Sequence, residues 1–400
     1  MVAQALNAAA PGRGARGGLT QPPEEPMRVL VLGSYAAALI NFRAQLIGEM
    51  VAAGHEVIAC APGWHAATAD ALAALGARYR AIALSRTGLN PTADIRDLIG
   101  LIRLFREVRP DLILVYTAKP VIYGGLAAAI AGVPHRFALI TGLGYAFTEG
   151  HEWRRRALRR VSRLLYRVSL ARADGIFFQN PDDLADFRRL GIVRDEQKLI
   201  MVNGSGVDTD RFAYCPLLKA GPANFLLIAR LVRDKGILDY VKAARHLKAR
   251  FPEARFRLLG PLDDNPAAIR RDELQSWQSE GVIEYLGRAD DVRPYLRQCT
   301  AYVLPSFYRE GVPRTILEAM AIGRAVITTD MPGCRETVVP DENGFLVPPH
   351  QPAALAAAME RLIVDPELAV IMGEKSRALA EARFDVRKVN AVMLHAMGLR

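Results

Sequence analysis

The stretch from Tyr302 to Gly344 limits the possible folds of this chain more than any other. An apolar run ends at a Pro-Ser turn, and a loop that carries Glu310 follows. A proline then stands where a helix can begin, since proline is tolerated in the first helical turn. Helically spaced apolar residues predict a helix over Pro313–Ala321 that stops near Gly323. A second apolar run, Ala325–Thr328, follows at once, so the stretch predicts a βαβ unit.

The helix of this unit begins at the carboxyl end of a strand. Its free backbone N–H groups and its dipole suit a phosphate there. Glu310 lies on the loop before the helix, Glu318 lies inside its first turns, and the compact residues Gly311, Val312 and Pro313 can let the backbone approach a ligand. Two glutamates at this spacing also arise by chance, so the βαβ context carries the interpretation.

Composition predicts a globular protein of more than one domain. The 400 residues are 51% hydrophobic, enough for large cores, and the length favours two or three domains. The longest apolar segment, Val121–Val133, is too short for a membrane span and is rich in Gly and Ala, like a close-packed helix. Residues 1–26 have no apolar signal segment, and we interpret them as a disordered leader before a first strand at Met27.

Cysteines and charge restrict the class further. The four cysteines are scattered without metal or redox spacing, which indicates reduced thiols in a cytoplasm, and the seven histidines form no ligand cluster, so no metal is predicted. The net charge of +10 favours an anionic partner: nucleic acid, a phosphate-bearing substrate or an acidic membrane surface.

Residues 27–212 alternate between apolar runs and helical segments. The pattern begins with a strand at Arg28–Leu32 and a helix at Asn41–Ala53 and predicts a parallel, doubly wound sheet. The first βαβ unit lacks the G-x-G-x-x-G pattern, which weighs against an NAD enzyme.

Ligands of such sheets bind at the carboxyl ends of the strands. Gly33, Lys119, Thr141 and Gly142 fall there and are candidate acceptor or cleft residues. For Gly33 a tight turn is an equal alternative, and Lys119 on sequence alone is better explained as a solvated loop lysine.

A basic amphipathic helix is predicted over Trp153–Ala171. Val161, Leu164 and Val168 share one helical face, and arginines occupy mostly the others. The favoured interpretation is a surface helix whose apolar face packs on the sheet; the alternative is docking on anionic lipid, and both can hold. No recognition helix or stacking aromatics support nucleic acid. The candidate membrane contacts are Arg155, Arg156, Arg159, Arg160 and Arg163.

A second domain is predicted over 213–384, with a linker at Pro216–Pro222 and a last helix in 385–400. Arg230 and Lys235 lie between a strand and a helix, where they can offset the charge of a diphosphate, although two basic loop residues are more often solvated surface. Gly287 and Arg288 follow another strand and are candidates for binding a base. We interpret the acidic pair in Asp208-Thr209-Asp210 as turn formation and not metal binding.

Several of these stretches resemble one known family. The Glu310–Glu318 segment resembles the Glu-x7-Glu signature of the retaining, nucleotide-sugar-dependent glycosyltransferases of family 4, and IARLVRDKGILDYVKAA resembles their diphosphate clamp. YTAKPVIYGGLAAAIAGVP and ITGLGYAF resemble a bacterial subgroup that builds polyprenyl-linked glycans, O antigens and capsules. The resemblance runs from about Met27 onward and implies the GT-B fold: two Rossmann-like domains facing a central cleft, with the last helix crossing back to the first.

The resemblance also implies a reaction. A hexose or N-acetylhexosamine would move, with retention, from a nucleoside diphosphate sugar, by expectation UDP-linked, to a polyprenyl-diphosphate-linked saccharide at the inner face of the cytoplasmic membrane, without cofactor or metal. Glu310 would contact the sugar, Glu318 the ribose, and Arg230 with Lys235 the diphosphate. Many members carry a His where this chain reads Gly142-Leu143-Gly144, so no His-based acceptor role is expected.

Two other classes remain open. One is a basic module that binds membrane or nucleic acid without catalysis, which explains the arginine helix but not the placed glutamates. The other is a phosphorylase or hydrolase on the same architecture. Hydrolysis would want a facing carboxylate pair, and phosphorolysis a pyridoxal phosphate lysine.

Overall fold

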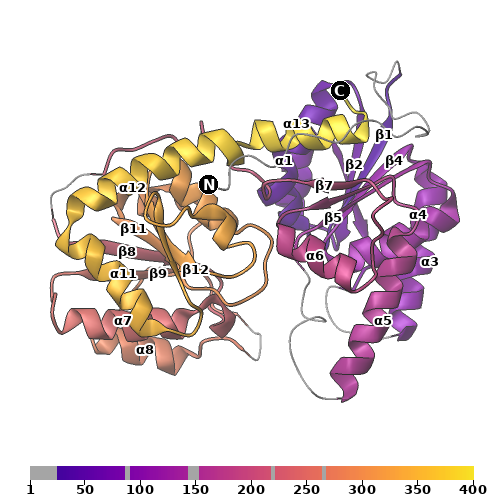
Figure 1. The fold of residues 1–400 in the computed structure, drawn as a ribbon. Coiled ribbons are helices and arrows are strands. Elements are labelled where there is room, and N and C mark those ends of the chain that lie inside the picture. Colours follow the sequence, from indigo (N-terminus) through magenta and orange to yellow (C-terminus); the bar gives the residue numbers. More distant parts are fainter. Residues whose placement is uncertain (1–24, 86–90, 143–152, 218–220, 264–266) are drawn as a thin grey trace.

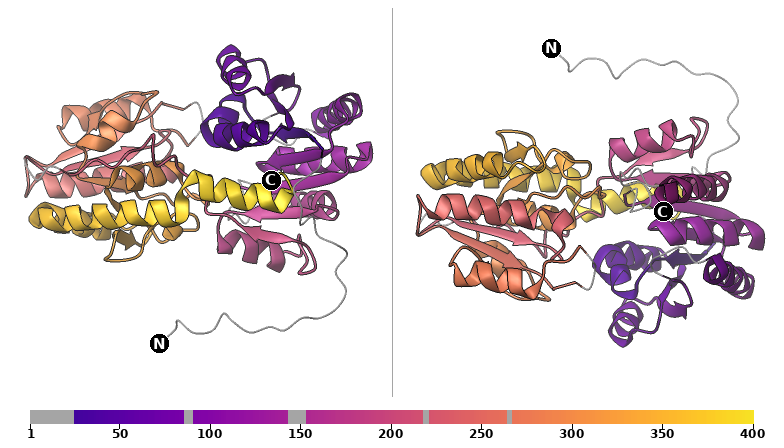
Figure 2. Two further views of the ribbon diagram at one scale, coloured as in Figure 1. Left: turned by 90° about the horizontal axis from the view of Figure 1, so that it is seen from above. Right: turned by 90° about the horizontal axis from the view of Figure 1, so that it is seen from below.

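Two α/β domains lie side by side, and helices cover both faces of each sheet (Figure 1, Figure 2). The computed structural model describes residues 25–85, 91–142, 153–217, 221–263 and 267–400. The first domain has a seven-stranded sheet of order β3-β2-β1-β4-β5-β6-β7, and the second a six-stranded sheet of order β10-β9-β8-β11-β12-β13. The paired strands are parallel, which confirms the predicted fold class.

The first domain contains these elements. Its strands are β1 (Arg28–Leu32), β2 (Glu56–Pro62), β3 (Arg78–Ile82), β4 (Leu112–Tyr116), β5 (His135–Ile140), β6 (Gly175–Phe178) and β7 (Leu199–Met201). Its helices are α1 (Ala36–Ala52), α2 (Ala66–Ala74), α3 (Pro91–Val108), a π-helical turn η1 (Pro120–Gly124), α4 (Gly125–Ala131), α5 (Trp153–Leu170) and α6 (Pro181–Arg189).

The second domain contains the remaining elements. Its strands are β8 (Asn224–Ile228), β9 (Arg255–Leu259), β10 (Glu284–Tyr285), β11 (Ala301–Leu304), β12 (Ala325–Thr329) and β13 (Gly344–Val347). Its helices are α7 (Ile237–Lys248), α8 (Arg271–Ser279), α9 (Arg293–Gln298), α10 (Arg314–Ile322), α11 (Pro352–Val364), α12 (Pro366–Leu379) and α13 (Val386–Met397); short turns are η3 (Arg233–Lys235), η4 (Arg335–Thr337) and η5 (Ala380–Phe384).

The strands are apolar at nearly every position because both faces of each sheet are covered. In β1, Leu30 and Leu32 join a core under α3 to α6, whereas Val29 and Val31 join a core under α1, α2 and α13. The second domain has one large core around β8, β11 and β12. Burial on both faces leaves the carboxyl ends of the strands as the place where loops can carry polar groups.

Several predicted boundaries were wrong. Helix α1 begins at Ala36, five positions before the predicted Asn41, because the small residues after Tyr35 are compatible with a helix that packs closely. The Gly- and Ala-rich segment Val121–Val133, expected to form a close-packed helix, is divided between η1 and α4. The strands β3 and β13 and the helices α2, α8 and α9 were not predicted, since short or half-exposed segments have weak periodicity.

The central βαβ unit is confirmed. Helix α10 starts one residue after Pro313, which is extended and caps it, and ends at Gly323 with φ of 90°, in the left-handed region that favours glycine. Its strands β11 and β12 pair in parallel, Ala301 opposite Ala325.

The chain passes between the domains twice, at neighbouring places. Val207 N–H donates to Phe384 O at 2.8 Å, and Val386 N–H donates to Val207 O at 3.0 Å. Val207 and Phe212 pack in the core of the second domain, so the first passage lies before the predicted boundary at residue 212. Helix α13 then runs along the first domain (Figure 1) and buries Met393 and Met397 in the core beside α1.

Candidate active site

Two loops at the carboxyl ends of β8 and β11 are bound to each other through the main chain. The Asp234 carbonyl accepts hydrogen bonds from the N–H groups of Phe307 (3.0 Å) and Tyr308 (3.2 Å). Gly236 lies so close to the Pro305 carbonyl that a Cβ would collide with it, and its φ is 74°. The loop with Lys235 is therefore fixed against the loop with Glu310.

This contact brings Lys235 and Glu310 together. Lys235 Nζ lies 2.6 Å from Glu310 Oε1, which also accepts from Ser306 Oγ at 2.9 Å, and both charged side chains are more than four-fifths buried. Lys235 also lies 5.9 Å from the centre of the Tyr308 ring. A cation and a carboxylate are thus held beside a polar loop. A charged substrate that binds there can replace the Lys235–Glu310 contact with its own contacts to each side chain.

Arg230 lies at the edge of this cluster. Its guanidinium is half-exposed and pairs with Asp263 at 2.8 Å. The pKa of Tyr308 is raised, chiefly by burial and also by the charge of Glu310. The positive charge of Arg230 partly opposes this rise. The structure therefore brings Lys235 and Glu310 into contact and leaves Arg230, paired with Asp263, at the edge of the cluster.

Glu318 occupies a second position along α10. It is buried and accepts from Arg314 Nε at 2.9 Å. Burial raises the pKa of Glu318, and Arg314 opposes this rise. Tyr302 on β11 is buried nearby: its hydroxyl contacts Ile228 O at 3.1 Å and Thr315 Oγ1 at 2.7 Å, and burial, with Glu318 and Glu310 as further causes, raises its pKa.

The first domain closes the other side of the Glu310 loop. Gly311 N–H donates to Thr141 O at 3.0 Å, and a Cβ on Gly142 would lie 3.1 Å from Arg309 O, so the backbones approach closely. Asn180, the cap of α6, donates from Nδ2 to Glu310 O at 3.2 Å. The candidate cleft residues Thr141 and Gly142 thus contact the loop that carries Glu310.

Ion pairs between the domains surround this contact. Arg309 pairs with Asp186, and Arg335 pairs with Asp182 at 3.2 Å. Asp182 lies in the first turn of α6 and Asp186 lies further along the same helix, whereas both arginines belong to the second domain. These pairs fix the first domain relative to the Glu310 loop.

Gly33 and Lys119 lie at the carboxyl ends of β1 and β4. A Cβ on Gly33 would collide with the Tyr116 hydroxyl, so glycine is needed there for close packing. Lys119 is almost buried and pairs with Asp94 at 2.8 Å. The interpretation of Lys119 as a solvated loop lysine was therefore wrong, because Asp94 compensates its charge inside the domain.

The other predicted site residues have simpler surroundings. Gly311, Val312 and Pro313 are buried just before α10. Gly287 has φ of 72° and accepts from Gly260 N–H at 2.8 Å, whereas Arg288 is exposed and pairs with Asp290 at 3.3 Å. Arg288 thus makes a surface ion pair outside the Lys235–Glu310 cluster.

The D-x-D segment forms a turn, as predicted. Asp208 Oδ1 accepts from the N–H groups of Asp210 (3.0 Å) and Arg211 (2.9 Å). Among the residues that the structure describes, no group of three or more His, Cys, Asp or Glu side chains is arranged to hold a metal ion.

Helix α5 exposes apolar side chains that the favoured interpretation had packed on the sheet. Val161, Leu164 and Val168 are 49%, 61% and 53% exposed, while Tyr166 and Leu170 are buried. That interpretation was wrong for these three residues, because the packed face of α5 is the one with Ser162, Tyr166 and Ser169. Arg160 and Arg163 are exposed and Arg159 is half-buried; the side chains of Arg155 and Arg156 lie outside the described part of the chain.

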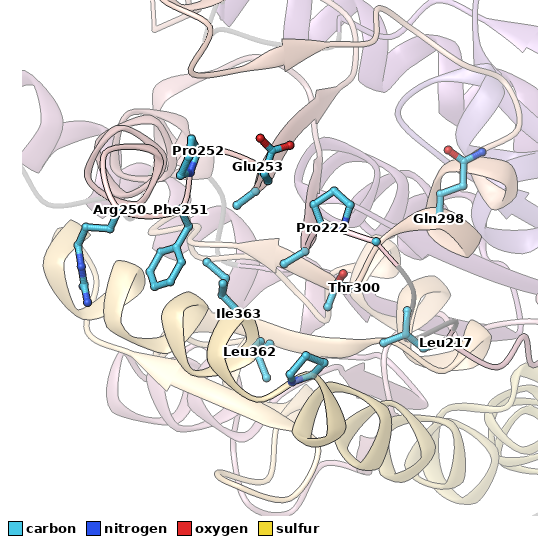
Figure 3. A pocket seen from close by; sticks show the side chains of 14 residues that line it. Leu217, Pro222, Arg250, Phe251, Pro252, Glu253, Gln298, Thr300, Leu362 and Ile363 are labelled. Carbon is cyan, nitrogen blue, oxygen red and sulfur yellow. The ribbon is translucent and has the colours of Figure 1, made fainter.

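A separate surface pocket lies at the opposite edge of the second sheet. Its lining includes Pro222, Glu253 and Thr300, which precede β8, β9 and β11, so it faces the amino ends of these strands (Figure 3). Arg250, Phe251 and Leu362 also line it. The Lys235–Glu310 cluster lies at the carboxyl ends, so this pocket is a different place.

Sequence reasoning missed several residues of the site. Ser306, Tyr308 and Arg314 lie within the central stretch, and their closeness to the two glutamates in sequence was the available signal. Asn180 and Asp186 come from the first domain, and nothing local in the sequence links them to residue 310.

Two facing Rossmann-like domains, with a carboxylate and two cations at the strand ends between them, are the architecture of GT-B glycosyltransferases. The family profile described as "Glycosyl transferase 4-like domain" matches residues 41–203, and the one described as "Glycosyl transferases group 1" matches residues 222–365. Together they cover most of both domains. The chain belongs to the family 4 glycosyltransferases and is a glycosyltransferase.

Curated relatives match over most of their length. An N,N'-diacetylbacillosaminyl-diphospho-undecaprenol alpha-1,3-N-acetylgalactosaminyltransferase of Campylobacter jejuni is 28% identical over 354 residues, 86% of this chain and 91% of the relative. A UDP-Gal:alpha-D-GlcNAc-diphosphoundecaprenol alpha-1,3-galactosyltransferase of Escherichia coli is 24% identical, over 74% of this chain and 77% of the relative.

Solved structures share the fold. Sucrose-phosphate synthase from Thermosynechococcus elongatus superposes with a TM-score of 0.75 and 20% identity, covering 92% of this chain and 97% of that one. Anabaena HepE in complex with UDP gives 0.72 and 20%, covering 92% and 98%. These likenesses establish the two-domain GT-B fold of this chain.

Proposed function

We propose that this glycosyltransferase moves a hexose or N-acetylhexosamine, with retention, from a UDP-sugar to a polyprenyl-diphosphate-linked saccharide. The contact of Lys235 with Glu310, both in second-domain loops at the strand ends, carries the proposal. Two curated relatives that match most of this chain act, by name, on diphospho-undecaprenol-linked sugars, and one of them uses UDP-Gal.

The proposed chemistry follows from the charges in the cleft. Cleavage of the sugar–phosphate bond develops positive charge on the ring and negative charge on the diphosphate, so the protein must stabilise the leaving group. Arg230, Lys235 and the N-terminus of α10 supply positive charge and N–H donors for this purpose. Glu310 would exchange its contact with Lys235 for the hydroxyls of the donor sugar, and Glu318 would bind the ribose.

Retention fits a reaction on one face of the sugar. The leaving phosphate, held by Arg230 and Lys235, would take the proton of the acceptor hydroxyl as that oxygen bonds to the anomeric carbon. In this mechanism the cations that offset the leaving charge are protein side chains, and we propose that the reaction proceeds without a metal or cofactor.

We also propose that the enzyme works on the surface of the cytoplasmic membrane. Among the helices of the described residues, none is both long and apolar enough to cross a membrane. The layer of α3, α4 and α5 instead exposes aliphatic side chains next to arginines. The exposed aliphatic residues are Ile95, Ile99, Ile130, Val161, Leu164 and Val168. The exposed arginines are Arg96, Arg103, Arg106, Arg160, Arg163 and Arg167.

This outer face suits anionic lipid. Glu107 is the exposed acidic residue among the described side chains of these three helices, and it already pairs with Arg80 at 2.8 Å. Aliphatic groups can enter the headgroup boundary while the arginines bind phosphate, each adding about 1 kcal/mol. Such docking would bring the cleft close to a lipid-linked acceptor.

Labelled UDP- and GDP-sugars test the proposal with purified protein, with and without a polyprenyl-diphosphate sugar and with EDTA as a further arm. We expect label to enter the lipid fraction only when the acceptor is present, and we expect EDTA not to change this transfer. NMR of the product should show the same anomeric configuration as in the donor. Release of free sugar or sugar phosphate would favour a hydrolase or phosphorylase. No turnover with any donor would contradict the proposal.

A further inference from the structure

Arg43 on α1 is a buried charge without a compensating partner. Its side chain is 3% exposed, its Nη1 donates to Phe42 O at 3.2 Å, and its Nε is buried with no hydrogen-bond partner. Within the described ranges, no carboxylate forms an ion pair with it. An unpaired buried charge costs several kcal/mol of folding free energy, so such a group usually has a function.

A second buried arginine of the same chain, Arg324, has hydrogen-bond acceptors for its whole guanidinium group. Arg324 is fully buried, and its guanidinium donates to the carbonyls of Leu296, Cys215 and Arg297 at 2.8 Å and of Gly323 at 3.0 Å. Every nitrogen of Arg324 has a partner. The contrast marks Arg43 as a buried guanidinium without an ion-pair partner in the part of the chain that the structure describes.

The surroundings of Arg43 lie at the strand ends that face the cleft. Its guanidinium carbon lies 5.2 Å from the centre of the Tyr116 ring, at the end of β4. The Tyr116 hydroxyl is buried without a hydrogen-bond partner and lies against Gly33, at the end of the neighbouring strand β1. Ligands of doubly wound sheets bind at such strand ends.

The second domain adds more positive charge to this place. Arg314, the first residue of α10, lies over the ring of Phe42 at 5.6 Å, next to Arg43 in the chain. Burial lowers the pKa of Arg43 to about 10, Tyr116 opposes this, and the charge of Arg314 lowers it further. Arg314 is itself paired with Glu318 at 2.9 Å, so Arg43 is the guanidinium of this region that has no carboxylate partner among the described residues.

We propose that Arg43 and the Tyr116 hydroxyl form an anion subsite on the first-domain side of the cleft, which takes a phosphate of a diphosphate-bearing substrate. A guanidinium with free donors and a neutral hydroxyl donor are the groups that bind phosphate oxygens. Both the donor nucleotide sugar and the lipid-linked acceptor carry a diphosphate, so the assignment to a substrate rests on the proposed function, whereas the subsite itself does not.

The test compares Arg43→Met with Arg324→Met in the full chain. Thermal unfolding without ligand should leave Arg43→Met as stable as the wild type or more stable, because an uncompensated charge is removed. Arg324→Met should be strongly destabilised, since it removes the buried hydrogen bonds of the guanidinium to four carbonyls. Arg43→Gln, which can still donate to the Phe42 carbonyl, serves as a second variant should Arg43→Met fold poorly.

Binding is then measured with UDP, inorganic pyrophosphate and a polyprenyl-diphosphate sugar. A tenfold to hundredfold weaker affinity of Arg43→Met for UDP and pyrophosphate would assign the subsite to the donor. Unchanged UDP affinity with a raised KM for the lipid-linked acceptor would assign it to the acceptor. Tyr116→Phe should weaken the same ligand severalfold without loss of stability.

Two results would overturn the subsite. One is a loss of stability in both Arg43 variants like that of Arg324→Met, with ligand affinities unchanged. The other is a set of affinities and KM values equal to those of the wild type. Because pyrophosphate and UDP binding need no turnover, weakened binding in a protein that transfers no sugar would keep the subsite and reject the proposed reaction.

Discussion

Glu310 and Lys235 owe their contact to the main chain around them more than to their own side chains. The N–H groups of Phe307 and Tyr308 both donate to the Asp234 carbonyl, so the two loops stay together whatever the carboxylate does. The site is therefore preorganised for a substrate that replaces the ion pair.

Glu310→Ala should lower kcat by about a hundredfold to a thousandfold, the range typical of removing one preorganised group that acts on the transition state. The fold should persist because the loop is held by backbone hydrogen bonds. Steady-state kinetics and thermal unfolding check this. Glu280→Ala, which removes a surface pair with Arg245, is the control and should leave kcat unchanged. A kcat within threefold of the wild type would reject the role of Glu310.

Asp183 predicts a pH dependence of stability. It is fully buried in the first turn of α6, and burial raises its pKa from 3.8 to about 6 against the hydrogen bond from Asn180. The native state therefore binds this proton more tightly than the unfolded chain does, and the free energy of unfolding falls as pH rises from about 4 to 6. Asp183→Asn should remove this fall.

Urea unfolding of both proteins at pH 4 and pH 7 measures the effect. The stability difference between wild type and Asp183→Asn should change by about 2 kcal/mol between the two pH values, in favour of the variant at pH 7. The readout is the change of this stability difference with pH. Any pH-independent effect of the new amide on stability is the same at both pH values and therefore cancels. A pH-independent difference would mean that Asp183 titrates normally.

At the scale of elements, α5 is the helix whose surroundings differ most from its pattern. Its apolar stripe suggested packing on the sheet, yet the stripe faces outward, and small or aromatic residues form the packed face. A helix with arginines beside exposed aliphatic groups is suited to the boundary between water and lipid.

Replacing Val161, Leu164 and Val168 together by Ser should weaken binding to vesicles that contain anionic lipid by at least tenfold, since aliphatic groups no longer enter the membrane. Replacing Arg160, Arg163 and Arg167 by Gln should weaken it roughly a hundredfold at about 1 kcal/mol each. Cosedimentation with vesicles measures both.

A matched control uses exposed aliphatic residues elsewhere. Val364, Ile371 and Val392 on α11, α12 and α13 are 68%, 47% and 45% exposed. Their joint replacement by Ser should leave vesicle binding unchanged. Equal losses in both triple variants would show that α5 has no special affinity for lipid.

At the scale of the molecule, the end of the chain completes the core of its beginning. Helix α13 follows the second domain but packs beside α1, with Met393, Met397 and Leu399 buried in the core of the first domain. His55 also lies 3.3 Å from the Leu399 carbonyl. The first domain therefore depends on residues more than 300 positions away.

Met397→Ala should destabilise the first domain by about 2–5 kcal/mol, the usual cost of emptying a buried site. Denaturant unfolding with hydrogen exchange on β1 and β4 checks which domain is affected. Val392→Ala, on the exposed side of the same helix, should change the free energy of unfolding by less than about 0.5 kcal/mol. Exchange that speeds up only in the second domain would contradict this account of α13.

Local chemistry was enough to predict the elements with strong patterns. Pro313 and Gly323 bounded α10 within one residue, and the predicted strand Arg28–Leu32 and the apolar run Ala325–Thr328 matched β1 and, within one residue, β12. The helices α2, α8 and α9 were not predicted, because short, half-exposed helices bury too few residues to give a clear hydrophobic periodicity. Lys119 was misread because its partner Asp94 lies 25 positions earlier in the chain.

By itself, the sequence determined the parallel α/β class, the βαβ unit around Glu310 and the placement of Arg230 and Lys235 at a strand end, because each depends on neighbours within a few turns of chain. Only the tertiary structure decided that Thr141 and Asn180 meet the Glu310 loop, that the aliphatic stripe of α5 faces outward, and that Arg43 makes no ion pair with any described residue. These outcomes depend on which surfaces two separately folded sheets bury against each other, and local periodicity carries no information about that choice.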